Sequence, residues 1–324
     1  MTLNSNLQQF LAGLFLLLTF TACSDDDDAT TPPVVETNTI ADFVASNDNY
    51  SSLEAALQVT GITATLAGTD NYTVFAPDND AFAAFLADNG FSSLSEVPVS
   101  ALTQILLNHV QMGEIMAADL STGYIESMAT GSASDDNLSM YISTEDGVMI
   151  NGVATVEQAN IEVDNGVIHA VDAVIGLPSV VTFALADPTF NTLVAALTRE
   201  DDFTFVSTLM KTGSPAPFTV FAPTNDAFGA LLEELEMSSL EDIPEDVLAS
   251  TLAYHVVAGA NVTSSMLADD MEVSTLAEQS FTIDLDNGAT ITDANGRTSN
   301  IVVVDVQANN GVIHVIDTVI LPEM

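Results

Sequence analysis

One stretch decides the fold: Thr73-Val74-Phe75-Ala76-Pro77-Asp78-Asn79-Asp80-Ala81-Phe82 returns as Thr219-Val220-Phe221-Ala222-Pro223-Thr224-Asn225-Asp226-Ala227-Phe228. Two further segments keep nearly the same spacing: Ser92-Ser93-Leu94 returns as Ser238-Ser239-Leu240, and Asn165-Gly166-Val167-Ile168-His169 returns as Asn310-Gly311-Val312-Ile313-His314. A period of about 146 residues is far longer than the roughly 20–50 residues of repeat arrays. The chain is therefore expected to contain two copies of one domain.

The repeat also predicts the domain boundaries. We expect a segment of residues 1–22 that is removed on export, a tether of residues 23–37, and two domains at residues 38–178 and 181–324. The connector around Pro178-Ser179 is short, so the two domains are expected to have little freedom relative to each other.

Each copy is predicted to combine helices and strands. Phe82, Phe85 and Leu86 have the spacing of a buried helix face, and Asp78 stands where the helix N-cap is needed. A second helix follows in each copy, and the later half consists of short apolar runs punctuated by Asn-Gly pairs, which favour hairpins. This order predicts an α+β fold with an antiparallel or mixed sheet.

The charge balance excludes some partners. The chain has 3 Lys and Arg residues against 46 Asp and Glu residues, a formal net charge of −43. No basic patch can be built, so nucleic-acid binding and electrostatic attraction to anionic lipid are not expected. Solubility explains the acidity best, and loosely bound Ca²⁺ is the alternative. No EF-hand pattern is complete, and Asp284-Leu285-Asp286-Asn287-Gly288 is interpreted as a hairpin turn, so no cofactor is predicted.

The N-terminus is typical of an exported protein. Phe10 to Ala22 form an apolar run that is shorter than the about 20 residues of a transmembrane helix, which suits a signal peptide. Cys23, the only cysteine, follows Thr21 and Ala22 as in the lipobox of bacterial lipoproteins, so Cys23 is predicted to be acylated and to hold the protein on the lipid bilayer. A plain secretory signal with an incidental cysteine remains the alternative, since Phe20 stands where Leu is usual.

An acidic run follows the cysteine. Ser24 to Asp28 resembles the surface-export tag of some Gram-negative lipoproteins, although a block of like charges is also typical of a solvated tail. The expected location is the outer membrane with the domains facing the exterior, and the periplasmic face remains open. The tether that follows is rich in Thr and Pro, which keeps it from folding.

The two repeated boxes together resemble the fasciclin (FAS1) family. They are the Thr-x-Phe-Ala-Pro-x-Asn-x-Ala-Phe box and the later Gly-Val-Ile-His box, and both occur in both copies. The resemblance implies two tandem domains, each a β-wedge of short sheets with flanking helices. It also implies an extracellular adhesion module that binds cell-surface proteins, matrix proteins or polysaccharide.

Two adhesion motifs of that family are carried over by position. The second copy has Tyr254-His255 at the end of its second core helix, where the first copy has Asn108-His109. The second copy has Asp305-Val306 before the Asn-Gly-Val-Ile-His box, where the first copy has Asn160-Ile161. The second copy is thus closer to the adhesive pattern of the family.

The four histidines pair between the copies, His109 with His255 and His169 with His314. A metal or catalytic role is one explanation. A buried side chain hydrogen-bonded to backbone is the preferred one, because each lies in an apolar stretch and no close His pair or cysteine ligand set exists. Asp172 and Asp317 follow the later histidines by three residues and are expected to be polar ties within the fold.

The sequence therefore favours a binding module over an enzyme, since no nucleophile motif accompanies the His and Asp residues. The leading hypothesis is cell-surface adhesion from a lipid anchor. A structural component of the envelope or biofilm that works by self-association is the alternative, and an enzyme acting on an extracellular polymer is the least favoured class.

Overall fold

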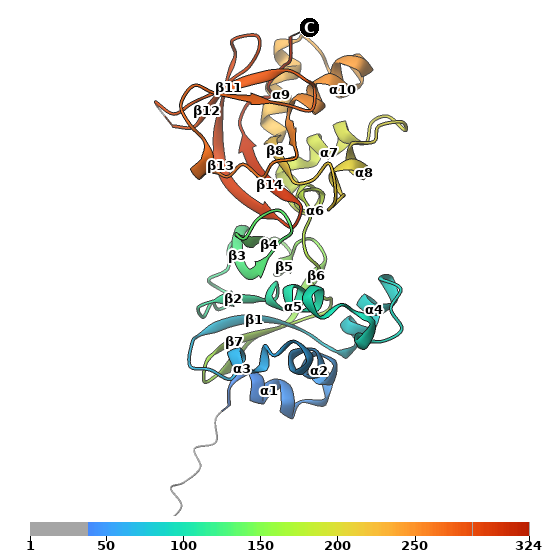
Figure 1. Ribbon diagram of the computed structural model, residues 1–324, viewed down its shortest axis with the longest axis vertical. Coiled ribbons are helices and arrows are strands. Elements are labelled where there is room, and N and C mark those ends of the chain that lie inside the picture. The colour runs from blue at the N-terminus through green and yellow to red at the C-terminus, as the bar shows by residue number, and fades with distance from the viewer. Residues whose placement is uncertain (1–37, 287, 324) are drawn as a thin grey trace, which may run out of the picture. The chain divides into compact units, whose positions relative to one another are not determined.

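The computed structural model describes residues 38–286 and 288–323. Within them, each copy of the repeat contains five α-helices and one connected sheet of seven strands, in closely matching chain order (Figure 1). We call the copy with α1–α5 and β1–β7 the first domain, and the copy with α6–α10 and β8–β14 the second domain. The predicted signal peptide, the tether and Cys23 lie outside the described residues.

Three helices precede the first strand of the first domain and two follow it. They are α1 (Ile40–Ser46), α2 (Ser51–Thr60), α3 (Thr63–Leu66), α4 (Asn79–Asp88) and α5 (Val99–Leu107). The side chain of Asp78 accepts a hydrogen bond from the Ala81 N–H at 2.8 Å, which confirms the predicted N-cap of α4. The short polar side chain thus satisfies one of the N–H groups that a helix leaves without a partner at its start.

The sheet of the first domain is mixed, as expected. Its strands lie in the order β2-β1-β7-β6-β5-β4-β3. The first strand runs parallel to the last, and every other neighbouring pair is antiparallel. The strands are β1 (Tyr72–Pro77), β2 (Val110–Met112), β3 (Gly123–Thr130), β4 (Asn137–Ser143), β5 (Met149–Ile150), β6 (Ala154–Val163) and β7 (Gly166–Val171).

The second domain repeats this arrangement in the order β10-β11-β12-β13-β14-β8-β9. Its helices are α6 (Val180–Ala186), α7 (Asn191–Leu197), α8 (Phe205–Leu209), α9 (Asn225–Glu234) and α10 (Glu245–Tyr254). Its strands are β8 (Phe218–Pro223), β9 (Val256–Ala258), β10 (Met271–Ser274), β11 (Ser280–Asp284), β12 (Thr290–Thr292), β13 (Thr298–Ala308) and β14 (Gly311–Ile316).

The longest strand of each sheet belongs to both halves of the wedge. Strand β6 pairs with β5 on one side and with β7 on the other, and its register shifts twice, between Val156 and Gln158 and between Gln158 and Ile161. Strand β13 has two register shifts in the corresponding place. Bulges bend a strand and increase its twist, so the sheet turns a corner here and encloses apolar side chains on both faces.

Each domain has two apolar clusters, one on the helix side of the sheet and one inside the wedge. Phe75 is fully buried in the wedge cluster of the first domain, and Phe221 is 1% exposed in that of the second. The predicted equivalence of these two positions is therefore confirmed. Tyr141 of the first domain joins the helix-side cluster of the second domain, so the two interiors meet at one place.

The connection between the domains is reinforced by hydrogen bonds. The Asn309 N–H donates to the Pro178 carbonyl at 2.7 Å, and the Gln307 N–H donates to Ser139 Oγ at 3.0 Å. Tyr124 donates its hydroxyl proton to Asp187 at 2.9 Å and packs edge-on against Phe183. Burial, and then the Asp187 carboxylate, raise the pKa of Tyr124 well above its usual value, so the hydroxyl stays a donor.

Candidate functional site

The Asn-Gly-Val-Ile-His segment, near the end of each domain, packs against the first helices and the first strand of the same domain. A Cβ at Gly166 would overlap the Tyr72 carbonyl, and a Cβ at Gly311 would overlap that of Phe218, so only glycine lets the parallel strands approach. The preceding asparagine holds the helices: Asn165 accepts from the Ile40 N–H at 2.8 Å and donates to the Leu66 carbonyl at 2.8 Å. Asn310 makes the same contacts in the second domain.

The histidine that ends this segment fixes a loop. His314 Nε2 lies 2.8 Å from the Val262 carbonyl, and its Nδ1 accepts from the Asp305 N–H at 3.4 Å. His169 has the corresponding contacts with Ile115 and Asn160 at 3.0 and 3.2 Å. One ring nitrogen donates and the other accepts, which only the neutral imidazole can do. Burial accordingly lowers the pKa of both rings.

The other two histidines hold the segment that leaves the last strand. His255 Nδ1 lies 2.7 Å from the Thr251 carbonyl, and its Nε2 accepts from the Ile320 N–H at 3.2 Å. His109 bonds Ile105 and Ile175 in the same way. Burial lowers the pKa of each ring from 6.5 to about 4. The preferred explanation of the histidines, a buried ring bonded to backbone, is confirmed for all four.

The tyrosine of the Tyr254-His255 pair is also inside the fold. Its ring is fully buried, its hydroxyl donates to the Ser280 carbonyl at 2.7 Å, and the Ala294 N–H donates to it at 3.2 Å. Asn108, its counterpart in the first domain, is fully buried and donates to the Gly176 carbonyl at 3.0 Å. These side chains hold the backbone around the C-terminal segment of each domain. Their role in adhesion stays a prediction.

Asp305 and Asn160 both adopt left-handed backbone conformations, with φ of 59° and 61°. Asp305 accepts hydrogen bonds from the backbone N–H and the hydroxyl of Ser264, while Asn160 accepts from the Ala117 N–H at 2.8 Å. Asp and Asn tolerate this conformation better than other side chains. The aliphatic partners point into the fold: Val306 is 2% exposed, and Ile161 packs against the helix-side cluster.

An exposed apolar strip directly precedes Asp305. Val302, Val303 and Val304 are 53%, 42% and 43% exposed on the bulged part of β13. The corresponding part of β6 carries Glu157, Gln158 and Ala159, all exposed. Next to this strip, a hollow of about 350 Å³ is lined by residues of both domains, among them Glu126, Asp136, Thr263 and Asp305.

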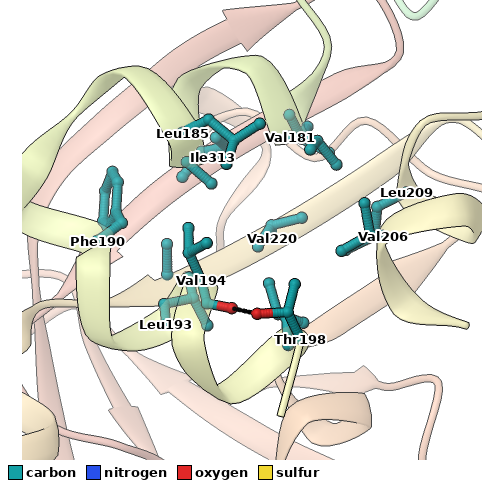
Figure 2. A pocket seen from close by; sticks show the side chains of 14 residues that line it. Val181, Leu185, Phe190, Leu193, Val194, Thr198, Val206, Leu209, Val220 and Ile313 are labelled. Carbon is teal, nitrogen blue, oxygen red and sulfur yellow. Dashed lines mark hydrogen bonds between the residues drawn. The ribbon is translucent and has the colours of Figure 1, made fainter. Parts of the chain in front are cut away.

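A second apolar feature lies on the helix side of the second domain. A cavity of about 80 Å³ is enclosed by α6, α7, α8 and the sheet, and its walls are almost entirely carbon (Figure 2). Thr198 is the one hydroxyl side chain in its wall, and its Oγ1 donates to the Val194 carbonyl at 2.8 Å. At the corresponding places in α2 the first domain has Glu54 and Gln58, which hydrogen-bond to each other at 2.8 Å.

The two aspartates that follow the later histidines bond to backbone of neighbouring strands. Asp172 accepts from the Thr155 N–H at 2.6 Å, and Asp317 accepts from the Asn300 N–H at 2.8 Å, so these carboxylates tie strands together as predicted and do not orient the histidines. Across the described ranges, no group of three or more His, Cys, Asp or Glu side chains is arranged to hold a metal ion.

The described helices are short for a membrane-crossing segment. No single described helix is long and apolar enough to cross a membrane. Among the described helices, one pair, Val180–Ala186 and Pro188–Leu197, has the length and composition only when its two members are taken together, and it is bent by 95°.

Two surface features were missed from the sequence. The strip Val302-Val303-Val304 stands where the first copy has Glu157-Gln158-Ala159, a contrast that aligning the copies would have revealed. Arg297, one of only three basic residues, has no basic counterpart in the first copy, and this too was visible in the alignment.

Comparison with known proteins agrees with this architecture. Residues 48–178 and 188–322 match the fasciclin domain family. The Synechocystis protein sll1483 is 38% identical over 174 residues, which cover 53% of this chain and 90% of that protein. Human periostin is 31% identical over 262 residues, which cover 79% of this chain and 29% of periostin.

A solved structure has the same fold. The FAS1 domain pair of the insect cell adhesion molecule fasciclin I superposes with a TM-score of 0.51, covering 83% of this chain and 97% of its own, at 19% sequence identity. The duplicated boxes, the two mixed sheets and these matches lead to one conclusion: the chain belongs to the fasciclin family and carries two FAS1 domains in tandem.

Proposed function

We propose that this protein is a cell-surface adhesion module that attaches cells to each other, to matrix or to polysaccharide, and that its second domain makes the main contact. The observation that carries the proposal is the exposed strip Val302-Val303-Val304, with Asp305 directly after it. Three neighbouring exposed valines on a rigid sheet are unusual for a surface that faces only water, and apolar patches of this kind mark interaction sites.

The buried motif residues support this strip. Asp305 holds the loop that begins at Ser264, and His314 holds the backbone N–H of Asp305. Tyr254 holds the turn between β12 and β13 through the Ala294 N–H, and His255 holds the C-terminal segment through the Ile320 N–H. Substituting them would therefore weaken adhesion by displacing the surface, without their side chains touching the partner.

The proposal includes the anchor. Cys23, acylated at the new N-terminus, would hold both domains at the outer membrane with their surfaces toward the exterior. A Cys23→Ser variant should leave the membrane fraction and appear in the soluble fraction. Retention of that variant in washed membranes would contradict lipidation at Cys23.

The adhesion proposal is tested by exchanging residues between the copies. The triple variant Val302→Glu, Val303→Gln and Val304→Ala gives the second domain the side chains of the first. Cells that display the full chain should aggregate or attach at least about threefold less with this variant, because apolar surface that would be buried on contact is removed.

A matched control is Val59→Glu, which changes a 57% exposed valine on α2 and should leave attachment unchanged. Equal attachment of the triple variant and the wild type, at equal surface amounts, would overturn the role of the strip. Sedimentation of the purified chain separates the alternative: loss of self-association in the triple variant would assign the strip to contact between copies of this protein.

A further inference from the structure

The first domain has a groove whose counterpart in the second domain is filled by a side chain of that domain. The groove has a volume of about 720 Å³ and runs between α4, α5, the turn after β5 and the segment after β7. Its walls are mainly apolar, with Phe85, Phe91, Ile105, Val153 and Leu177 among them. Sites for small ligands and peptide segments have this size and this mainly apolar lining, with a few placed polar groups.

One buried donor in the groove wall, the side-chain NH2 group of Asn151, has no hydrogen-bond partner among the described residues. Asn151 is 3% exposed, and its Oδ1 accepts from the Tyr141 N–H at 2.7 Å, which fixes the orientation of the amide. Its Nδ2 makes no hydrogen bond within residues 38–286 and 288–323. A buried N–H donor without an acceptor is costly, so this donor favours a ligand that brings a carbonyl oxygen.

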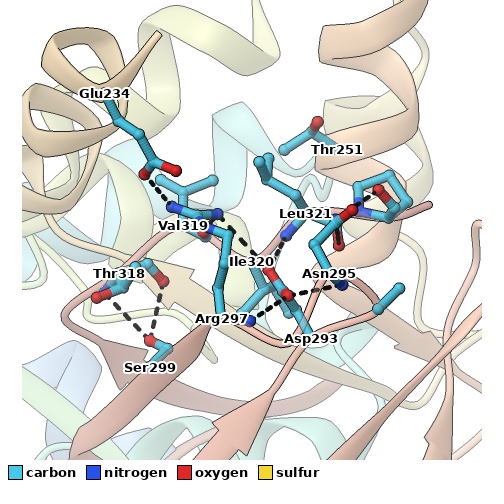
Figure 3. A network of polar contacts seen from close by, with 12 residues as sticks. Glu234, Thr251, Asp293, Asn295, Arg297, Ser299, Thr318, Val319, Ile320 and Leu321 are labelled. Atoms are coloured by element: carbon cyan, nitrogen blue, oxygen red, sulfur yellow. Dashed lines mark hydrogen bonds and ion pairs between the residues drawn. The ribbon is translucent and has the colours of Figure 1, made fainter. Parts of the chain in front are cut away.

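The second domain shows what occupies the corresponding place. Arg297, in the turn between β12 and β13, extends to α9 and donates to Glu234 at 2.7 Å (Figure 3). The same guanidinium donates to the Val319 carbonyl at 2.9 Å and lies 3.5 Å from Asp293. The second domain therefore fills this position with its own arginine side chain.

The first domain presents the same receiving groups. Asp88 ends α4 as Glu234 ends α9, and Val174 follows β7 as Val319 follows β14; both Asp88 and Val174 line the groove. The turn between β5 and β6, residues 151–153, is shorter and carries no arginine, and its Val153 lines the groove. No Lys or Arg precedes Arg199, so the first domain contains no basic residue to pair with Asp88.

From this comparison we infer that the groove of the first domain binds an arginine-bearing segment of a partner protein. The guanidinium pairs with Asp88 and the Val174 carbonyl, as Arg297 does with Glu234 and Val319. An apolar side chain next to the arginine packs against Phe85 and Phe91, and a main-chain carbonyl of the partner accepts from Asn151 Nδ2.

Charge complementarity favours a basic partner segment over an acidic or neutral one. The chain carries a net charge of −43, which attracts basic segments and repels acidic ones. Guanidinium binds carboxylate and carbonyl oxygens together because its planar fork presents several donors. The groove thus adds a class of partner, a protein segment with an exposed arginine, to the proposed adhesion function. It rests on that function only in treating the chain as a binding module.

The test uses the full chain and an acetylated valine-arginine-phenylalanine amide as the probe. The same peptide with citrulline in place of arginine keeps the shape and removes the charge. We expect the arginine peptide to bind at least about tenfold more tightly than the citrulline peptide, since charge-assisted hydrogen bonds are about twice as strong as neutral ones. Equal binding of the two peptides would overturn the inference.

Three variants locate the site. Asp88→Asn should weaken the arginine peptide about three- to tenfold, whereas Asp146→Asn removes the same charge from an exposed position that does not line the groove and should change nothing. Val153→Arg should abolish binding by supplying the arginine from within. Equal effects of the two Asp→Asn variants would mean general attraction to an acidic surface and would contradict the assignment.

Peptide binding and cell attachment are separate measurements. Loss of peptide binding in Val153→Arg with attachment intact would support the groove as a site of its own. Loss of attachment in the β13 triple variant with peptide binding intact would leave this inference standing.

Discussion

The two domains have the same frame and different surfaces. The buried Phe, Asn, Gly and His residues that join the first strand to the last make matching contacts in both copies. The outer positions differ: the strip on β13 is apolar where β6 has Glu157 and Gln158. The wall of the helix-side cavity has Val194 and Thr198 where α2 has a Glu-Gln pair. The two copies therefore share their buried frame and differ at exposed positions.

The contact between the domains shows the same contrast. Tyr124 and Tyr141 face each other across β3 and β4 and meet the second domain. In the second domain the register places Glu272 opposite Thr282 in the corresponding strands. A face that meets another domain carries aromatic side chains, and its counterpart carries polar ones.

The largest expected effect tests whether the frames are equivalent. Phe75→Ala and Phe221→Ala should each destabilise their domain by about 3–5 kcal/mol, because each removes a fully buried ring. Phe221 should cost more, since it also packs edge-on against Phe281 with centroids 5.0 Å apart. Urea unfolding of each variant measures the loss.

Val59→Ala is the control for these variants and should change stability by less than about 0.5 kcal/mol, as exposed positions do. A cost below about 1 kcal/mol for either phenylalanine would contradict the equivalence of the two cores.

The next effect concerns pH. Burial lowers the pKa of His109 and His255 from 6.5 to about 4, so between these values the unfolded chain binds more protons than the folded chain. Their contribution to stability is complete above pH 6.5 and falls as the pH drops, by about 1.4 kcal/mol per pH unit for each ring.

The histidine effect is measured with His255→Gln and His109→Gln, which should each have a smaller loss of unfolding free energy than the wild type between about pH 6.5 and pH 5. Comparison with the wild type cancels the titration of the many carboxylates. An imidazole that titrates near 6.5 in NMR spectra of the folded chain would be incompatible with its burial.

A smaller effect distinguishes the groove of the first domain from the arginine-filled place in the second. Arg297→Val should destabilise the second domain by about 1–3 kcal/mol, because the Val319 carbonyl and the buried Asp293 carboxylate lose the guanidinium. Val153→Arg should change the first domain by less than about 1 kcal/mol, since the new pair with Asp88 is exposed to water. Thermal unfolding of the two variants side by side checks the difference, and equal losses would contradict it.

The smallest effect concerns the contact between domains. Tyr124→Phe removes the hydrogen bond to Asp187 and should cost about 1 kcal/mol. Glu272→Gln, at the corresponding position of the second domain, should cost less than about 0.5 kcal/mol. A double-mutant cycle of Tyr124→Phe with Asp187→Asn measures the coupling, and additive effects would show that the bond contributes nothing.

The sequence predicted the frame well because its signals are local. Phe82, Phe85 and Leu86 lie on α4, and Asn151-Gly152 forms a turn with both residues at positive φ, as this pair favours. The second pair does mark a hairpin, but its turn residues are Asp164 and Asn165, and Gly166 already begins β7. The identity of each strand's neighbours was not predicted, since parallel pairing of β1 with β7 joins residues far apart in sequence.

The site was less predictable for a related reason. The motif Tyr254-His255 is recognisable as letters, but whether those rings face water depends on the segment around Ile320 that covers them. The difference between the domains at the groove depends on one side chain, Arg297, which extends to α9 in the second domain. Composition and periodicity do not predict which distant residue a side chain contacts.

The pairing of the first strand with the last has a consequence for synthesis. Tyr72 lies beside Gly166, and Phe218 lies beside Gly311, so each sheet lacks its central partner until nearly the whole domain has been made. Such long-range closure is slow, and the unpaired strand remains open to wrong contacts in the meantime. A ribosome that stalls before Gly166 would therefore release a chain without a stable domain, and removing the last strand from the finished protein would unfold the second domain as a whole.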